Sequence, residues 1–455
     1  MRLRLRLAAL TLTLGLALSL VAPPGAQAAE AGPGRAIRVG LGTTLTQVQL
    51  SADGAYTLVN LASGAPVLDG SAGQAVTIQV NQAGLAVAGV GTFTGPLRLQ
   101  PAAGSDGQPG IARSGSKRYR GVLEVSRNAA GLITLVNELD LEDYLPGVVP
   151  REMPPSFPAE ALKTQAVAAR TYALYQMQNS KFAGQGFDVV DTVDSQVYGG
   201  VNSEDARSNA AVQATRNQVI VYGGQVINAM FFASGGGHTE NNENVFTASV
   251  PYLKGVPDYD QESPKYNWTV TLPLVEMQKT LAGKGMDVGT VYGLEPAGPR
   301  GVSGRWTTLA LVGSKGRLEV KASQLRLALG LNSTLFDIVP HQEGMQAVQV
   351  PLAADQPVTA LAAGGQVATV SPGQAVVQGA GGTRLSLAGQ PAVAVGKQLV
   401  PASLELVGHG WGHGVGLSQW GARGMANSGH TFDDILRHYY QGTSVGPRPD
   451  LAVSN

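Results

Sequence analysis

The chain has no cysteine among its 455 residues and little charge, since only 14% of its residues are Asp, Glu, Lys or Arg. The missing thiols exclude disulfide bonds, cysteine nucleophiles and cysteine-ligated zinc. The 32 basic and 32 acidic side chains balance. This balance argues against a nucleic-acid-binding protein, because such proteins normally carry a basic excess or a basic stripe.

Glycine and proline are abundant instead, with 60 and 26 residues, and the hydrophobic fraction is an ordinary 44%. This combination is typical of a loop-rich globular protein rather than a disordered one. The length suggests about two to four domains, with ample chain to bury a core.

Residues 1–28 have the three regions of a secretory signal peptide. Three arginines lie among the first six residues, an apolar run follows over residues 7–22, and small residues stand at Ala26 and Ala28. The alternative, an uncleaved membrane anchor, is weaker because the run is shorter than the ~20 residues that span a bilayer. We therefore predict a secreted or periplasmic protein of the cell envelope, with no stable membrane span after cleavage.

Two segments of short alternating apolar runs with very few charges indicate small β modules, at residues 29–115 and 341–400. Residues 48–89 align without a gap with residues 348–389, and 14 of these 42 positions are identical. This match favours a duplicated module over shared composition. The second module is then an insertion, because the segments on both sides of it, residues 116–340 and 401–455, are expected to form one core.

Helix signals interrupt the strand patterns in this core. Pro158 and Glu160 suit the first turn of a helix that runs to about Met177, and Ser203 is the expected N-cap of a second helix. Strands are expected around residues 219–222 and 226–232. We predict the α+β class: a mixed core of a few helices and antiparallel strands, with small all-β accessory modules.

Two more helices are expected near the C-terminus. Ser418 can cap a helix that runs to about Asn427. Thr431 and Asp434 have the spacing of a capping box at the start of a last helix, which should end before Gly442.

Every second residue from 408 to 416 is glycine. A period of two predicts an extended strand with one bare backbone face, which lets another chain or a ligand approach closely. The segment has no G-x-G-x-x-G register, so it is not a dinucleotide-binding loop. In a strand, His409 and His413 would lie about 13 Å apart, too far to share a metal ion.

Several ordered blocks of sequence resemble the sporulation stage II protein D/LytB family. The blocks are EDYLPGVVPREMP at 142–154, FPAEALKTQAVAARTY at 157–172, QVYGG at 196–200, SGGGHTE at 234–240, PYL at 251–253 and GHGVGLSQWGA at 412–422. The resemblance covers about residues 119–337 and 404–442, and it includes neither β module.

This resemblance implies action on peptidoglycan. Sporulation members resemble lytic transglycosylases that cut the glycan strand, preferably after amidases have removed its peptides, whereas LytB-type members are described as enhancers of a wall amidase. The partners that the resemblance implies are therefore peptidoglycan glycan strands and a cell-wall amidase. The alternative to an enzyme is a non-catalytic enhancer that presents glycan to that amidase.

The family's catalytic acid lies in the block that reads Arg151-Glu152-Met153-Pro154 here, so the resemblance implies Glu152. Glycoside cleavage needs a carboxylic acid whose pKa is raised from ~4.3 toward ~6–7. A single acid is enough for a lytic transglycosylase, because the 6-hydroxyl of the sugar itself attacks the anomeric carbon. We expect Pro150 and Pro154 to stiffen the loop around Glu152, and the apolar Met153 and Pro154 to shield it from water.

For each of the other candidate site residues, the alternative to a functional role is a purely structural one. Arg170 is expected to steady developing charge or to orient Glu152, unless it forms an ordinary salt bridge. The candidate substrate-binding residues are Gln196, Tyr198, Ser234, Tyr252, His413 and Gln419. Asp191 and Asp194 are candidates for a second carboxylate if the enzyme is a hydrolase. A nucleophilic pair of Ser234 and His238 is a minor alternative.

Some members of the family bind zinc through His and Cys just before the Gln-x-Tyr-Gly block. This chain has Asp188, Asp191, Asp194 and Ser195 there and no cysteine. We therefore predict no metal and no cofactor. The role of the two β modules is open, and binding of wall polymer is one hypothesis for them.

Overall fold

The computed structural model describes residues 36–449, with gaps at 105–106, 108–109, 341–345 and in the links between the short strands of 346–400. The predicted signal peptide lies outside the described residues. Helices and mostly antiparallel strands make up the described chain, so the predicted α+β class is confirmed. No helix within the described residues has the length and hydrophobicity that crossing a membrane requires.

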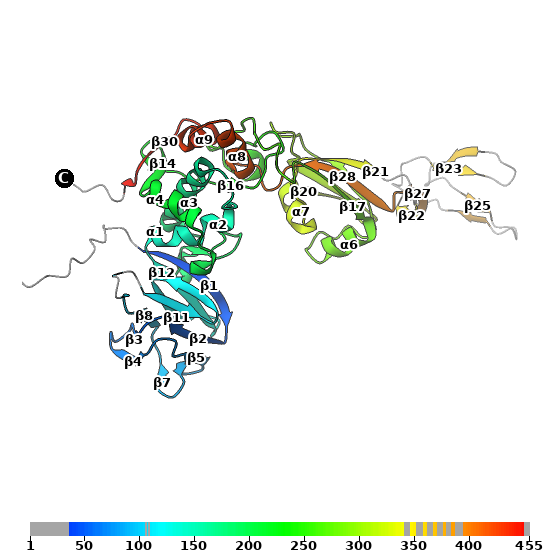
Figure 1. The fold of residues 1–455 in the computed structure, drawn as a ribbon. Helices are drawn as coiled ribbons and strands as arrows, with labels where there is room; N and C mark the ends of the chain where they lie inside the picture. Colours follow the sequence, from blue (N-terminus) through cyan, green and yellow to red (C-terminus); the bar gives the residue numbers. More distant parts are fainter. Residues whose placement is uncertain are drawn as a thin grey trace, which may run out of the picture.

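Two sheets form the N-terminal β unit at the bottom of Figure 1. In spatial order, the first contains β13 (Val189–Val190), β1 (Ile37–Leu45), β12 (Ile133–Leu139), β11 (Val122–Arg127), β8 (Leu97–Pro101), β3 (Tyr56–Asn60) and β4 (Pro66–Gly70). The second contains β10 (Lys117–Arg120), β9 (Ile111–Ser114), β2 (Gln47–Ala52), β5 (Val76–Asn81), β6 (Gly84–Val87) and β7 (Gly91–Phe93). Buried side chains from both sheets, among them Leu50, Leu58, Ile78 and Leu99, belong to one hydrophobic cluster.

The expected boundary at residue 115 falls inside this β unit and needs correction. β10 pairs with β9, and β11 pairs with β8, so strands on both sides of residue 115 complete the same two sheets. β12 then pairs with β1 along most of its length. The β unit therefore extends to Leu139, and the helices of the core begin directly after it.

The core is built around one long helix, α3 (Ala159–Asn179), which confirms the predicted helix. Its small buried side chains, including Ala161, Ala166 and Ala173, allow neighbouring elements to pack closely against it. The elements before β14 are α1 (Leu141–Tyr144), η1 (Leu145–Gly147), α2 (Val149–Glu152), η2 (Ala183–Gln185), η3 (Gly200–Ser203) and α4 (Ala206–Ala214). After them come β14 (Gln218–Tyr222), β15 (Gln225–Val226), β16 (Phe231–Phe232) and α5 (Asn242–Val245).

The second predicted helix begins later than expected. Asp205 is the N-cap of α4, and its side chain accepts from the Arg207 N–H. Ser203 instead closes the preceding turn η3, where its hydroxyl donates to the carbonyl oxygens of Gly147 and Gly200. The single strand expected over 226–232 is also wrong, because β15 and β16 pair with different strands.

The C-terminal segment returns to the core and packs against α3. It contains β28 (Ser403–His409), β29 (Leu417–Ser418), α8 (Gln419–Asn427), α9 (Phe432–Tyr439) and β30 (Ser444–Pro447). β29 pairs with β16, and β30 pairs with β14. The Ser418 cap and the capping box of Thr431 and Asp434 are both present, as predicted.

The alternating-glycine segment is not an extended strand. β28 ends at His409, and Gly410, Gly412, Gly414 and Gly416 all have φ between +73° and +119°. This left-handed region favours glycine because side chains with a Cβ are strained there. The alternation therefore encodes a tightly turning loop that threads past Phe232 and Met230, rather than a ribbon with one bare face.

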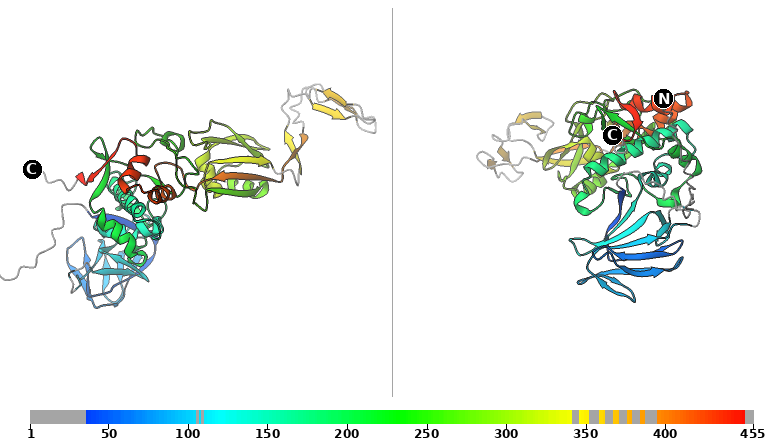
Figure 2. Two further views of the ribbon diagram at one scale, coloured as in Figure 1. Left: turned by 45° about the horizontal axis from the view of Figure 1, so that its top comes forward. Right: turned by 90° about the vertical axis from the view of Figure 1, so that its left-hand side faces the viewer.

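An outer lobe with its own hydrophobic cluster projects from the core, as the views in Figures 1 and 2 show. One sheet contains β17 (Asn267–Pro273), β28 and β21 (Phe336–Pro340), and another contains β18 (Val291–Pro296), β19 (Thr308–Gly313) and β20 (Gly316–Lys321). The lobe also includes α6 (Leu274–Ala282) and α7 (Ala322–Leu329).

The insertion leaves this lobe between β21 and β28. It contains β22 (Gln346–Pro351), β23 (Val358–Leu361), β24 (Val367–Val370), β25 (Val376–Gln378), β26 (Arg384–Ser386) and β27 (Val395–Val400). The first five begin 299 to 302 residues after β2, β3, β4, β5 and β6. The hairpins β23–β24 and β25–β26 also repeat the pairings β3–β4 and β5–β6. These regularities support the hypothesis of a duplicated module.

Candidate functional site

Glu152 is the last residue of α2, and its carboxyl group is half-buried. The Val197 N–H donates to its Oε1 at 2.7 Å. Burial raises the pKa of Glu152, although the Val197 hydrogen bond, the side-chain amide of Gln419 and the nearby Arg151 act in the opposite direction. The group is therefore biased toward the protonated form that an acid catalyst needs.

The surroundings of Glu152 differ in part from the prediction. The residue ends a helical turn instead of lying in a proline-braced loop. Met153 is fully buried, whereas Pro154 is exposed. The segments that carry Val197 and Gln419 lie against the carboxyl group.

Gln196 and Tyr198 flank Val197, and both point into the core. Gln196 accepts from the Tyr144 hydroxyl and donates to the Ala169 carbonyl, each at 3.3 Å. The Tyr198 hydroxyl donates to Asn137 Oδ1 at 2.8 Å. Because both side chains are fully committed inside the protein, we correct their predicted role: they hold the backbone so that the Val197 N–H faces Glu152.

Gln419 lies at the start of α8, and it brings the C-terminal segment into the site. Tyr172 on α3 also lies near Glu152, since burial and the charge of Glu152 together raise the pKa of Tyr172 to about 12. The Tyr172 ring meets the Phe231 ring edge to face, with 6.2 Å between centroids. Tyr172 and Val197 were not among the predicted site residues, although the helical spacing of Gln165 and Tyr172 on α3 places these two on one face.

Arg170 does not reach Glu152, and its predicted catalytic role needs correction. Its guanidinium group is fully buried and forms a two-pronged ion pair with Glu142, at 2.7 and 2.8 Å. The remaining N–H groups donate to the carbonyl oxygens of Val212 and Gln218. Arg170 therefore ties α3 to α1, α4 and β14, and it serves as a structural residue.

The Ser234 loop is also structural. Ser234 is fully buried and donates to Asp260, while the N–H groups of Gly236 and Gly237 donate to the same carboxylate at 2.7 and 2.9 Å. His238 is engaged through Nδ1 with the Thr239 carbonyl. These contacts contradict both a substrate-binding Ser234 and a Ser–His nucleophile. Tyr252 accepts from the Asn228 N–H at 3.2 Å and packs beside Tyr222, and neither contact involves Glu152.

His413 is held as a neutral side chain. Burial lowers its pKa to about 4. Nδ1 accepts from the Val415 N–H, so Nε2 carries the proton that is donated to the Phe231 carbonyl, both at 3.1 Å. Both ring nitrogens thus fix the glycine-rich loop against β16, and this geometry does not support the predicted contact with substrate.

The aspartates before the Gln-x-Tyr-Gly block do not form a metal site. Asp188 accepts from the Arg38 N–H, and the Ser195 hydroxyl accepts from the Val190 N–H. Asp191 faces Lys117 at 3.8 Å, and Asp194 is exposed. Within the described chain no three His, Cys, Asp or Glu side chains gather in the way that a metal ion requires. The zinc site of some family members therefore does not fit these residues.

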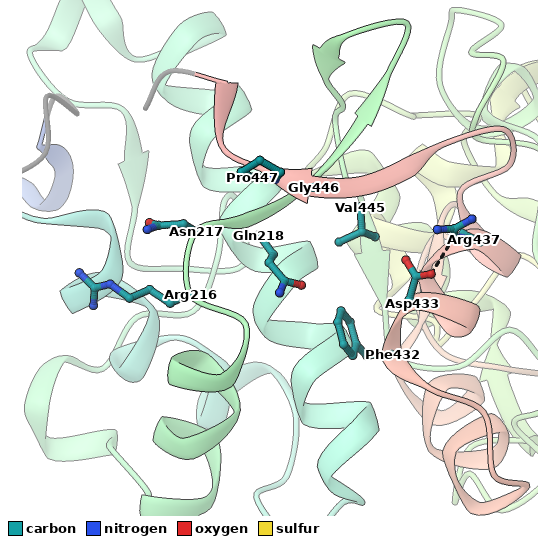
Figure 3. Close-up of a pocket in the computed structure, with 9 residues that line it drawn as sticks. All are labelled: Arg216, Asn217, Gln218, Phe432, Asp433, Arg437, Val445, Gly446 and Pro447. Atoms are coloured by element: carbon teal, nitrogen blue, oxygen red, sulfur yellow. Dashed lines mark ion pairs between the residues drawn. The ribbon is translucent and has the colours of Figure 1, made fainter. Parts of the chain in front are cut away.

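A hollow of about 450 Å³ lies between α9, β30 and the start of β14, and Figure 3 shows it in close-up. Its nine described lining residues include Gln218, Phe432 and the ion pair of Arg437 with Asp433, but none of the predicted site residues. The Glu152 site is therefore distinct from this hollow, and it is defined by the hydrogen bonds around the carboxyl group.

Comparisons with known proteins agree with the blocks that form this site. A family model described as "Stage II sporulation protein" matches residues 129–222, a segment that contains Glu152 and Val197. "Stage II sporulation protein D" of Bacillus subtilis is 32% identical over 327 residues, which is 68% of this chain and 75% of that protein. The chain belongs to the stage II sporulation protein D/LytB family.

Two further relatives extend this picture of the stage II sporulation protein D/LytB family. The "Amidase enhancer" of Bacillus subtilis is 30% identical over 308 residues, or 66% of this chain, but the match spans only 40% of the enhancer. An uncharacterized protein of Brachyspira hyodysenteriae is 29% identical over 416 residues, or 90% of this chain and 92% of that protein. Membership of the family supports a cell-wall-related function for this chain.

Proposed function

We propose that this protein is an exported peptidoglycan lytic transglycosylase with Glu152 as its general acid and base. The observation that carries the proposal is the half-buried carboxyl group of Glu152, whose pKa is raised by burial and which is held by Val197 and Gln419. Such a group is protonated over a wider pH range than an exposed glutamate, yet it has two donors ready to stabilise its anion.

The chemistry needs only this one carboxyl group. Protonated Glu152 donates its proton to the glycosidic oxygen as the bond from that oxygen to the anomeric carbon breaks. The 6-hydroxyl of the same sugar forms the new bond to the anomeric carbon, and its proton passes to the Glu152 carboxylate. The acid is thereby regenerated, and one glycan end becomes a 1,6-anhydro sugar.

We infer this route rather than hydrolysis from the surroundings of the two candidate second carboxylates. A hydrolase requires a second carboxylate within ~5–9.5 Å, and the two candidates have other surroundings: Asp191 faces Lys117, and Asp194 is exposed.

Product analysis tests the proposal. Purified protein is incubated with peptide-free glycan strands, and the products are examined by mass spectrometry for 1,6-anhydro ends. We expect wild type to form them, Glu152→Gln to form at least ~100-fold fewer, and the control variants Asp191→Asn and Asp194→Asn to retain activity. Products with reducing ends, lost in either aspartate variant, would instead establish a hydrolase.

The printed name of the Bacillus amidase enhancer favours a second candidate function. In this case the protein would bind glycan and raise the rate of a wall amidase without cutting the strand. A wild-type protein that forms no anhydro ends, but accelerates peptide release by an added amidase equally with Glu152 or Gln at position 152, would support this function.

A further inference from the structure

Arg423 is an arginine of α8 whose guanidinium group rests on two aromatic rings. Its Cζ lies 4.9 Å from the centroid of the Trp420 ring and 5.2 Å from that of the Phe157 ring. The two rings meet edge to face, with 5.0 Å between their centroids. A guanidinium group held over aromatic rings is restricted in its movement and presents its N–H groups along its edge. The rings therefore hold this cation in a defined place.

Phe157 belongs to the segment that directly follows Glu152. The Phe157 N–H donates to the Pro154 carbonyl oxygen at 3.0 Å, so residues 154–157 form a turn whose ends lie less than ~7 Å apart. Two more residues lead back to Glu152, which places its Cα within ~15 Å of the Phe157 Cα. Met153 belongs to the same hydrophobic cluster as Phe157 and the buried side chains of α8. α8 therefore packs against the chain immediately after the proposed acid.

The order of side chains on α8 agrees with this placement. Gln419 and Arg423 are four residues apart on this helix, so their side chains are neighbours on one face of it. The side-chain amide of Gln419 also acts against the rise in the pKa of Glu152. Arg423 and Gln419 thus both lie along the segment 152–157, and a short piece of glycan strand can reach from Glu152 to the guanidinium group.

Stability does not explain an arginine at position 423. A long side chain with an apolar stem, such as methionine, would cover the two rings as well. The charge is paired with Glu262, whose Oε2 lies 3.1 Å from Nη1, but the Arg423 and Glu262 side chains are 31% and 59% exposed. Ion pairs as exposed as this contribute little to stability. What methionine lacks is the planar set of N–H donors, which matches the two oxygens of a carboxylate.

We propose that Arg423 binds the lactyl carboxylate of a muramic acid residue in the glycan strand. This inference rests on the proposed function, which supplies the glycan. The lactyl group of muramic acid ends in an amide while the stem peptide is attached and in a carboxylate once the peptide has been removed. A guanidinium group distinguishes the two, because its hydrogen bonds to a carboxylate are charge-assisted and those to a neutral amide are weaker. Arg423 is therefore a specificity-determining residue.

Binding to a modified glycan tests the proposal without catalysis. The probes are peptide-free glycan strands and the same strands with their lactyl carboxylates converted to methyl esters. In titration calorimetry with Glu152→Gln, which leaves the strands uncut, we expect about tenfold tighter binding of the free-acid strands. Adding Arg423→Met should abolish this difference, whereas adding Arg437→Met, in an exposed ion pair of α9, should keep it. Equal binding of the two probes by Glu152→Gln overturns the proposal.

A third probe identifies which carboxylate is bound. Strands that still carry their stem peptides have peptide carboxylates but no lactyl carboxylate. We expect Arg423→Met to weaken the binding of peptide-free strands about tenfold and to leave the binding of peptide-bearing strands unchanged. An equal loss with both kinds of strand would show that Arg423 binds a peptide carboxylate or supports the fold, and it would overturn the proposal. If Arg423→Met does not fold, Arg423→Gln replaces it in every test.

Kinetics and stability separate recognition from a structural role. We expect Arg423→Met to raise KM for peptide-free strands about tenfold with little change in kcat, while the thermal midpoint stays the same. A fall in thermal midpoint and kcat with unchanged KM would show a merely structural residue. If wild type makes no anhydro ends, the proposed catalytic function of Glu152 fails, but the binding tests still decide whether Arg423 recognises the lactyl carboxylate.

Discussion

Arg170 illustrates how a side chain in a block that matches the family can serve the fold. Its guanidinium group and Glu142 are both buried, and their two hydrogen bonds connect the long helix to the segment that leads to Glu152. Such a pair holds its geometry tightly, because either partner alone would leave an uncompensated charge in the interior.

Removing this arginine should therefore destabilise the protein. We expect Arg170→Met to lower the free energy of unfolding by about 3 to 5 kcal/mol, because it leaves the Glu142 carboxylate buried and unpaired. Urea unfolding followed by circular dichroism measures the change. The double variant Arg170→Met with Glu142→Leu should recover part of the loss, and Arg207→Met in an exposed ion pair should have little effect. Normal stability of Arg170→Met with loss of glycan cleavage would restore a catalytic role.

At the scale of elements, the glycine-rich loop before α8 determines how the C-terminal segment enters the core. A Cβ at Gly416 would lie 2.2 Å from the Met230 carbonyl oxygen, at a residue whose φ is +79°. Leu417 N–H donates to that same oxygen as β29 begins its pairing with β16. Close backbone contact at this point is therefore a condition for placing Gln419.

We expect Gly416→Ala to destabilise the protein by about 1 to 3 kcal/mol more than Gly429→Ala. Gly429 has a similar φ of +90° but open space around its Cα, so the control carries the same backbone strain without the clash. Urea unfolding of both variants measures the difference. Equal losses would show that strain alone, and not close approach to Met230, determines the choice of glycine at Gly416.

Local signals predicted local features well. The caps of α8 and α9 were predictable because Ser418 and Thr431 bond to backbone within three residues. The glycine alternation was misinterpreted, since a period of two also fits a loop in which every second residue turns left-handed. Contacts between residues far apart in the sequence were not predictable. Nothing in the sequence near Arg170 shows that its guanidinium group forms an ion pair with Glu142.

The same limit applies to the candidate site. A resemblance of motifs could point to Glu152, but its two donors come from Val197 and from Gln419, whose positions depend on the assembled core. Gln196 and Tyr198 lie beside one of these donors, yet their side chains face the opposite way, into a cluster with Tyr144. A sequence motif identifies such residues without showing which side of the backbone faces the ligand.

At the scale of the whole molecule, a buried carboxyl group links stability to pH. Burial and the neighbouring charge of Asp260 raise the pKa of Asp258 to about 6, against about 3.9 in an unfolded chain. The folded state therefore binds this proton more tightly than the unfolded state. Its contribution to stability is complete below about pH 4 and is lost as the pH rises through about 6.

We expect this linkage to appear as a difference between wild type and Asp258→Asn, which cannot titrate. The stability of wild type relative to the variant should be greater at pH 4 than at pH 7, by about 2 kcal/mol. Urea unfolding at several pH values measures it, and titrating groups that do not interact with Asp258, such as His413 with its lowered pKa, act on both proteins alike. The linkage would be contradicted if the stability of wild type relative to Asp258→Asn stayed constant or increased as the pH rises.

The insertion is expected to be separable from the rest of the molecule. Pro340 of β21 lies opposite Leu404 of β28, so a three-residue hairpin loop of Asn-Gly followed by Ser403 can replace residues 341–402 and keep this strand pairing. We expect a variant with Asn-Gly at this junction to keep its thermal midpoint and its activity on soluble glycan. Loss of binding to intact walls would assign wall binding to the insertion, whereas an unfolded product would show that the insertion stabilises the lobe.

The contact between Gln419 and Glu152 has a consequence for the time at which the protein becomes competent. The two residues are separated by more than half of the 455-residue chain, and contacts of such long range form slowly. In a chain that is synthesised from its N-terminus, the surroundings of Glu152 stay incomplete until roughly the last tenth of the chain, which carries Gln419, has been made and has docked on the core. The proposed cleavage of glycan should therefore lag behind the appearance of helix and sheet during refolding.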